Sequence, residues 1–286
     1  MPIYDQRYRA YEARAPLRQA RFWPITREAL RLLLQRKAFL GLLALCWLPF
    51  VGFAIYIWAV TRFSGMVGND LQRLLAVDGG FFMRFYSWQL PLAMLVTVFA
   101  GSGLIAHDLR TNAILVYLSR PLTRRDYVLG KFLTLALLNA GVTLAPCLLL
   151  YGVGLALVSD QLLTFERAHL APAIAGVGLL FTATLSLLML AVSSLSKSAR
   201  VAGLSFFGLL MGLEVLRALV WVAYRTRWAT LVSVQGTLRS FGNALFDVQE
   251  RSLGVPWPAC LAVLLALGAG CLLVLRARVR AVEVVA

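Results

Sequence analysis

The chain has 286 residues, of which 60% are hydrophobic and only 14% are charged, and its mean hydropathy is +0.77. About a quarter of the residues in soluble domains are charged, so this composition excludes an ordinary soluble globular protein. The net charge of +15 would suit nucleic-acid binding, but Arg and Lys gather at the ends of apolar runs. That distribution favours a membrane protein, and no nucleic acid is expected among its partners.

The first predicted element is a helix over residues 24–37, which read PITREALRLLLQRK. Its proline stands where a helix can begin. Ile25, Ala29, Leu32 and Leu33 share one helical stripe, opposite a basic face. This pattern predicts an amphipathic helix in the membrane interface, and the alternative is a helix packed on another protein surface.

Six apolar runs are long enough to cross a bilayer as helices. We therefore expect an all-α, polytopic membrane protein, with a cytoplasmic segment at residues 1–37 and a transmembrane domain at residues 38–286. The predicted spans are residues 38–60, 88–106, 132–158, 173–195, 201–223 and 258–275.

The basic residues predict the orientation of these spans. The side that carries both termini has 19 Arg or Lys, and the other side has eight. Because basic loops stay in the cytoplasm, both termini are expected to be cytoplasmic, in a multi-pass protein of the cell membrane.

No catalytic or metal-binding constellation is found in the sequence. Its two histidines, His107 and His169, fall at opposite membrane boundaries, and the four cysteines lie inside apolar runs without metal-ligand spacing. The phosphate-binding loop G-x-x-x-x-G-K-[ST] does not occur. We expect no enzyme activity, no metal and no cofactor in this chain.

The most informative stretch is the loop between the second and third spans, residues 107–131. It contains an apolar patch at residues 113–118 that predicts a short helix below the membrane. Thr123 and Asp126 have the spacing of a capping box that would begin the next helix. A short helix held between two spans is suited to binding a soluble partner.

In this loop the chain resembles the ABC type-2 permease family. Members carry an acidic residue, then Gly-Thr four and five places on, then an apolar helix, a Leu-Ser-x-Pro turn and a closing Gly-Lys. Asp108 matches the acidic position, and Gly130 and Lys131 match the close. Asn112 stands in place of the glycine, and Asn tolerates a left-handed backbone almost as well.

The resemblance implies a coupling helix that docks on a separate ATPase subunit, which would bind ATP and Mg. It also implies a second permease, identical or related, and an exported substrate. The residues expected to couple to the ATPase are Asp108, Asn112, Ser119, Arg120, Pro121, Arg124, Arg125 and Asp126. The alternative is a membrane scaffold or regulatory subunit that docks a cytoplasmic partner without transport.

Two polar features lie further along the chain. Glu214 and Arg217 stand three residues apart in the fifth span, where each charge alone would cost about 2.5 to 3.5 kcal/mol at the bilayer centre. They are expected either to pair with each other or to line a substrate path. Residues 224–257 predict short helices in the outer leaflet, anchored by Trp228 and Trp257, with a solvated loop as the alternative.

Overall fold

The computed structural model describes residues 22–63, 78–113, 123–157, 169–248 and 255–278. In these ranges every regular element is a helix, and six helical segments are long and apolar enough to cross a membrane. These segments are Lys37–Arg62, Gly79–Arg110, Arg124–Leu157, Leu170–Leu195, Ala199–Tyr224 and Trp257–Arg278. The expectation of an all-α polytopic membrane protein is confirmed.

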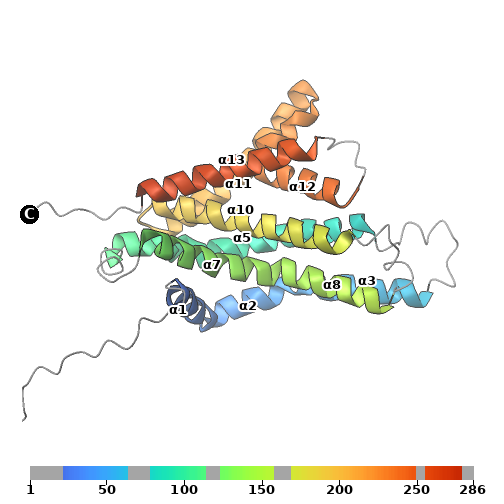
Figure 1. Cartoon of the computed structure of the whole chain (residues 1–286), viewed down its shortest axis with the longest axis horizontal. Coiled ribbons are helices and arrows are strands. Elements are labelled where there is room, and N and C mark those ends of the chain that lie inside the picture. Colours follow the sequence, from blue (N-terminus) through green and yellow to red (C-terminus); the bar gives the residue numbers. More distant parts are fainter. Residues whose placement is uncertain (1–21, 64–77, 114–122, 158–168, 249–254, 279–286) are drawn as a thin grey trace, which may run out of the picture.

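The segments lie side by side as a bundle (Figure 1). We call the end that carries α1 (Trp23–Leu34) and the last turn of α13 (Trp257–Arg278) the terminal end, and the other the distal end. The helix α5 (Gly79–Arg110) begins nine residues before the predicted span, because an aromatic stretch continues the helix beyond the apolar run.

The core of the bundle is formed by α5 and α10 (Leu170–Leu195), which pack along each other. Gly101 makes this possible, since a Cβ there would lie 2.5 Å from Cγ of Met189 and 3.0 Å from Cδ1 of Leu135. Next to it, Asn139 accepts a hydrogen bond from Thr97 at 2.9 Å and donates one to Ser186 at 3.2 Å. Three helices are thus joined by side-chain hydrogen bonds in the bundle interior.

Two spans are broken at internal positions. The first consists of α2 (Lys37–Cys46) and α3 (Leu48–Phe63), and the third of α7 (Arg124–Val142) and α8 (Leu144–Leu157). Pro146 has no N–H to offer the carbonyl of Val142 four residues earlier, which accounts for the second break. The buried Gln89 of α5 donates through Nε2 to the Cys46 carbonyl at 2.8 Å and to that of Val142 at 2.6 Å.

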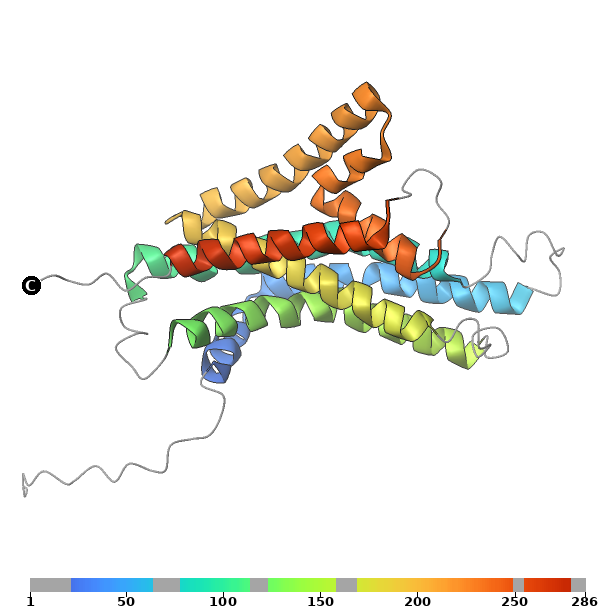
Figure 2. The ribbon, with the colours of Figure 1, turned by 45° about the horizontal axis from the view of Figure 1, so that its top comes forward.

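The remaining spans are more peripheral. Much of the surface of α2, α3 and α11 (Ala199–Tyr224) consists of exposed large apolar side chains. Figure 2 shows α11 leaning away from the bundle toward its distal end, with the following short helices beneath it. In α11 the buried residues all lie in the first half of the helix: Ala202, Gly203, Phe206 and Leu210.

Those short helices are η3 (Arg227–Val232) and α12 (Val234–Leu245). The expectation of short helices is met, with Trp228 and Trp257 about half exposed, at 50% and 53%. Most of α12 is buried against α5, α10, α11 and α13. Its first turn lies beside Met94, near the middle of α5, where Nε2 of Gln235 donates to the Met94 sulfur at 3.3 Å. The two short helices η3 and α12 therefore form a hairpin that re-enters the bundle to about half its depth.

Candidate functional site

The predicted loop joins two well-formed helix ends at the terminal end of the bundle. Asn112 follows α5 with φ of 53°, so the left-handed turn predicted for this residue is present. On the other side, Thr123 accepts a hydrogen bond from the Asp126 amide at 3.2 Å, and Asp126 accepts one from the Thr123 amide at 3.0 Å. The predicted capping box is confirmed, and it fixes the start of α7.

Asp108 ties the two sides of this loop together. Its Oδ2 lies 2.8 Å from Nζ of Lys131 and accepts a hydrogen bond of 2.8 Å from the Tyr127 hydroxyl. Asp108, Tyr127 and Lys131 are all buried. A buried charge is tolerated only when it is paired and hydrogen-bonded, so these three residues form a clamp between the end of α5 and the start of α7.

The N-terminal helix α1 docks on the same place. Oγ1 of Thr26 donates to the Gly130 carbonyl at 3.0 Å. A Cβ at Gly130 would lie 3.0 Å from Cβ of Ile25, so glycine allows the close approach of the two helices. Ile25, Thr26 and Leu33 form the buried face of α1, whereas Leu32 of the predicted stripe is 54% exposed. The docked face is thus centred on Thr26, and the membrane-interface position of this helix stays a prediction.

The other predicted coupling residues fall into two groups. Arg124 and Arg125 are exposed in the first turn of α7, and the partly buried Asp126 belongs to the cap. Ser119, Arg120 and Pro121 lie outside the described residues. The predicted helix at residues 113–118 does too, except for its first residue.

The sequence pattern indicated no role for Tyr127 or Thr26. The signal for Tyr127 was its position four residues before Lys131, which places both side chains on one face of α7.

A second cluster of charges joins α11 to the re-entrant hairpin. Arg217 contacts Oε1 of Glu214 through Nε at 2.8 Å and Nη2 at 2.6 Å, so the predicted pair is formed. Oε2 of Glu214 accepts a hydrogen bond from Ser233, the N-terminal cap of α12. The pair therefore anchors the leaning half of α11 to α12.

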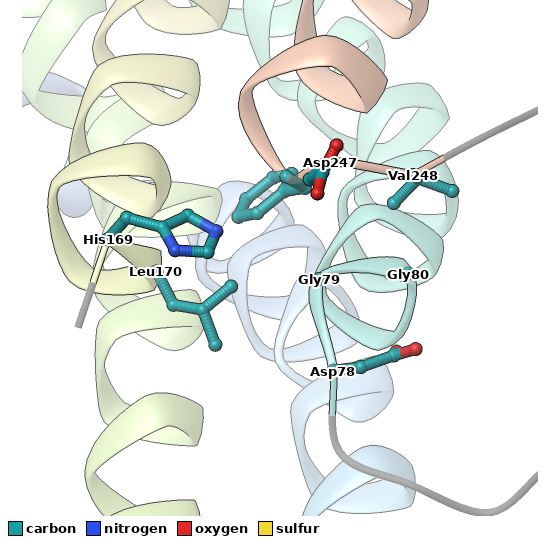
Figure 3. A pocket seen from close by; sticks show the side chains of 8 residues that line it. Asp78, Gly79, Gly80, His169, Leu170, Asp247 and Val248 are labelled. Atoms are coloured by element: carbon teal, nitrogen blue, oxygen red, sulfur yellow. The ribbon is translucent and has the colours of Figure 1, made fainter. Parts of the chain in front are cut away.

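The distal end has a pocket of about 310 Å³ lined by residues that include Asp78, His169 and Asp247 (Figure 3). Asp78 points away from His169 and caps α5 by accepting from the Phe81 amide at 2.9 Å. Among the described residues, no three His, Cys, Asp or Glu side chains are grouped so that they could hold a metal ion. His107 is exposed at the other end of the bundle.

The six apolar helices define a polytopic, all-α membrane protein. A family model described as ABC-2 family transporter protein matches residues 23–236, from α1 to the start of α12. No curated protein sequence matches the chain. The chain belongs to the ABC-2 transporter family and is a permease of ABC transport systems, whose members in general associate with an ABC ATPase.

Proposed function

We propose that this permease is the membrane subunit of an ATP-driven exporter and that the loop at residues 107–131 receives the movement of a separate ATPase subunit. ATP and Mg would be bound by that partner. The observation that carries the proposal is the Asp108 clamp, because it joins both stems of the loop below the spans.

The clamp gives a physical route for coupling. A force applied to the loop reaches α5 and α7 together, since Asp108 belongs to one and Lys131 to the other. It also reaches α1 through the bond from Thr26 to Gly130. An ATPase can drive a conformational change only if it contacts the loop differently in its two nucleotide states. The buried Asp108 would transmit that change, and exposed residues would contact the partner.

Arg124 and Arg125 are the described loop residues best suited to that contact. Both are exposed cations in the first turn of α7, held in place by the capping box. The excess of 19 basic residues over eight on the side of the termini supports a cytoplasmic location for this end in the cell membrane. An acidic groove on the ATPase would complement them.

A second permease, identical or related, would complete the transporter. The helices α2, α3 and α11 support this, because many of their large apolar side chains are not covered by other helices of the chain. Part of that surface would face lipid. The export path would then lie between the two permeases.

The test is co-purification with the partner ATPase and measurement of ATP hydrolysis in nanodiscs. Reversing both charges, Arg124→Glu with Arg125→Glu, is expected to weaken ATPase association and to lower the hydrolysis that the permease stimulates. The matched control is Lys197→Glu, another exposed basic residue at the terminal end. Equal association and equal hydrolysis in wild type, control and double variant would refute the coupling role. Association without any effect on hydrolysis or transport would favour a scaffold.

A further inference from the structure

The contact between α11 and α12 contains more positive than negative charge. Arg217 and Arg239 both act on Glu214, the first by direct hydrogen bonds and the second within electrostatic range. Both carboxylate oxygens of Glu214 are already occupied, one by Arg217 and the other by Ser233. Two guanidinium groups therefore share one carboxylate, and the cluster keeps a net charge of one positive unit.

Arg239 has a buried donor that no described residue satisfies. Its Nε is buried and has no hydrogen-bond partner among the described residues, and no ion pair to Arg239 is found there. A guanidinium has five N–H donors and no acceptor, so a ligand that offers oxygen acceptors, and an anion above all, would satisfy the buried Nε. Among the described residues, Glu214 accepts hydrogen bonds from Arg217 and Ser233 and none from Arg239.

The position of the cluster in the bundle makes this surplus charge costly. Glu214 lies near the middle of α11, and α12 begins beside Met94 near the middle of α5. Cations at such depth in a membrane are rare and are found paired or at functional positions. The cluster is also accessible, because the side chains of Arg217 and Glu214 are 29% and 26% exposed.

Its surroundings on α11 are apolar. Val215, Leu216 and Leu219 are exposed beside the charged pair. Arg217 itself lies across α12, since a Cβ at Gly236 would be 3.0 Å from its Cδ. A charged site bordered by an exposed apolar helix matches a molecule with an anionic head and an apolar tail.

We infer that Arg217 and Arg239 form a binding site for one anionic head group, a phosphate or a carboxylate, between α11 and the re-entrant helix α12 (Figure 2). The arginines supply bidentate, charge-assisted hydrogen bonds, and Glu214 competes with the head group for Arg217. The head group can belong to a bilayer lipid or to a transported amphiphile. Binding needs no ATP and no partner subunit, so this inference is independent of the proposed coupling.

The test uses the full chain, stripped of lipid in a neutral detergent and titrated while native mass spectrometry counts bound molecules. The probes are short-chain phosphatidylglycerol, the neutral short-chain phosphatidylcholine, and inorganic phosphate as a competitor. One phosphatidylglycerol is expected to bind wild type in preference to phosphatidylcholine. Arg239→Gln is expected to weaken that binding about tenfold, or about 1.4 kcal/mol. The control Arg84→Gln, which removes an exposed arginine of α5, is expected to leave it unchanged.

Glu214→Gln separates a binding site from a merely structural cluster. Removing the competing carboxylate is expected to raise the affinity for phosphatidylglycerol, whereas loss of structure would lower it. If Arg239→Gln does not fold, Arg239→Lys keeps the charge but loses the bidentate geometry, and a several-fold weaker binding is expected. Competition by inorganic phosphate would show that the head group alone suffices, and its failure would show that the site requires the lipid tails. Equal binding by wild type and the Arg239 variants, or weaker binding by Glu214→Gln, would overturn the inference.

Discussion

Breaking the clamp at the base of the loop is expected to destabilise the permease strongly. Nζ of Lys131 lies 2.8 Å from Oδ2 of Asp108, and the two side chains are 8% and 11% exposed. At an effective dielectric constant of about 20, two unit charges at this distance attract by about 6 kcal/mol. Removing both charges from water costs several kcal/mol for each ion, so the intact pair contributes little net stability.

Removing a single partner is different, because it leaves the other charge buried alone. Lys131→Met is expected to cost about 3 to 5 kcal/mol of unfolding free energy. For Asp108→Asn the loss is expected to be similar, since Lys131 then has no counter-charge. The double variant Asp108→Asn with Lys131→Met should recover most of the loss, because no buried charge remains and Asn can still accept the bond from Tyr127.

The assay is unfolding of the purified protein in one detergent, followed by the loss of helical circular dichroism on heating. At about 2 to 4 °C per kcal/mol, each single variant should lower Tm by roughly 6 to 20 °C. Arg124→Met, which removes an exposed charge of the same loop, should shift unfolding by less than about 0.5 kcal/mol. Single variants that match this control, or a double variant that adds the two losses, would refute the clamp.

Four further predictions rest on contacts in the spans and on the charge distribution. A cysteine placed at either terminus is expected to react only from the cytoplasmic side, because basic residues favour that face by 19 to eight. In a double-mutant cycle of Glu214→Gln and Arg217→Gln, a non-additivity of about 0.5 to 3 kcal/mol in stability is expected. Gln89→Met removes two interhelical hydrogen bonds and should cost about 1 kcal/mol. Gly101→Ala places a methyl group 2.5 Å from Met189 and should cost about 1 to 3 kcal/mol, partly restored by Met189→Ala.

Each of these has an outcome that contradicts it. Termini that label from opposite sides would exclude an even number of spans. Strictly additive losses for Glu214 and Arg217 would mean that the two side chains do not interact. Unchanged melting of the Gln89 variant would show that the two broken spans do not depend on it. If Met189→Ala fails to restore the stability of the Gly101→Ala variant, the strain does not come from the contact with Met189.

The spans were predictable from sequence because the bilayer imposes one simple requirement. A run of about 20 apolar residues has to form a helix there, whatever its tertiary contacts. The capping box at Thr123 and the left-handed Asn112 were predictable for a similar reason, since both depend on neighbouring backbone alone. Features that depend on local sequence alone can be predicted without knowledge of how the helices pack.

The contacts of the candidate site depend on helix packing and were not predictable in the same way. Asp108 was expected to act in coupling, but the identity of its partners follows from how α5 and α7 lie against each other. The burial of α12 could not be read from Gln235, Thr237 and Ser240, because polar residues also suit a helix in the interface. Their burial requires the space that the leaning α11 leaves beside the bundle (Figure 2).

Gln89 also limits how the broken spans can move. Its one amide nitrogen holds carbonyls from two different spans, at the two places where those spans are interrupted. A movement that carried the end of α2 or of α7 away from α5 would leave a backbone acceptor unbonded in a membrane interior, where water cannot replace the lost donor. The two joints are therefore held on one side chain of α5, which fixes the points at which α3 and α8, packed on each other, begin.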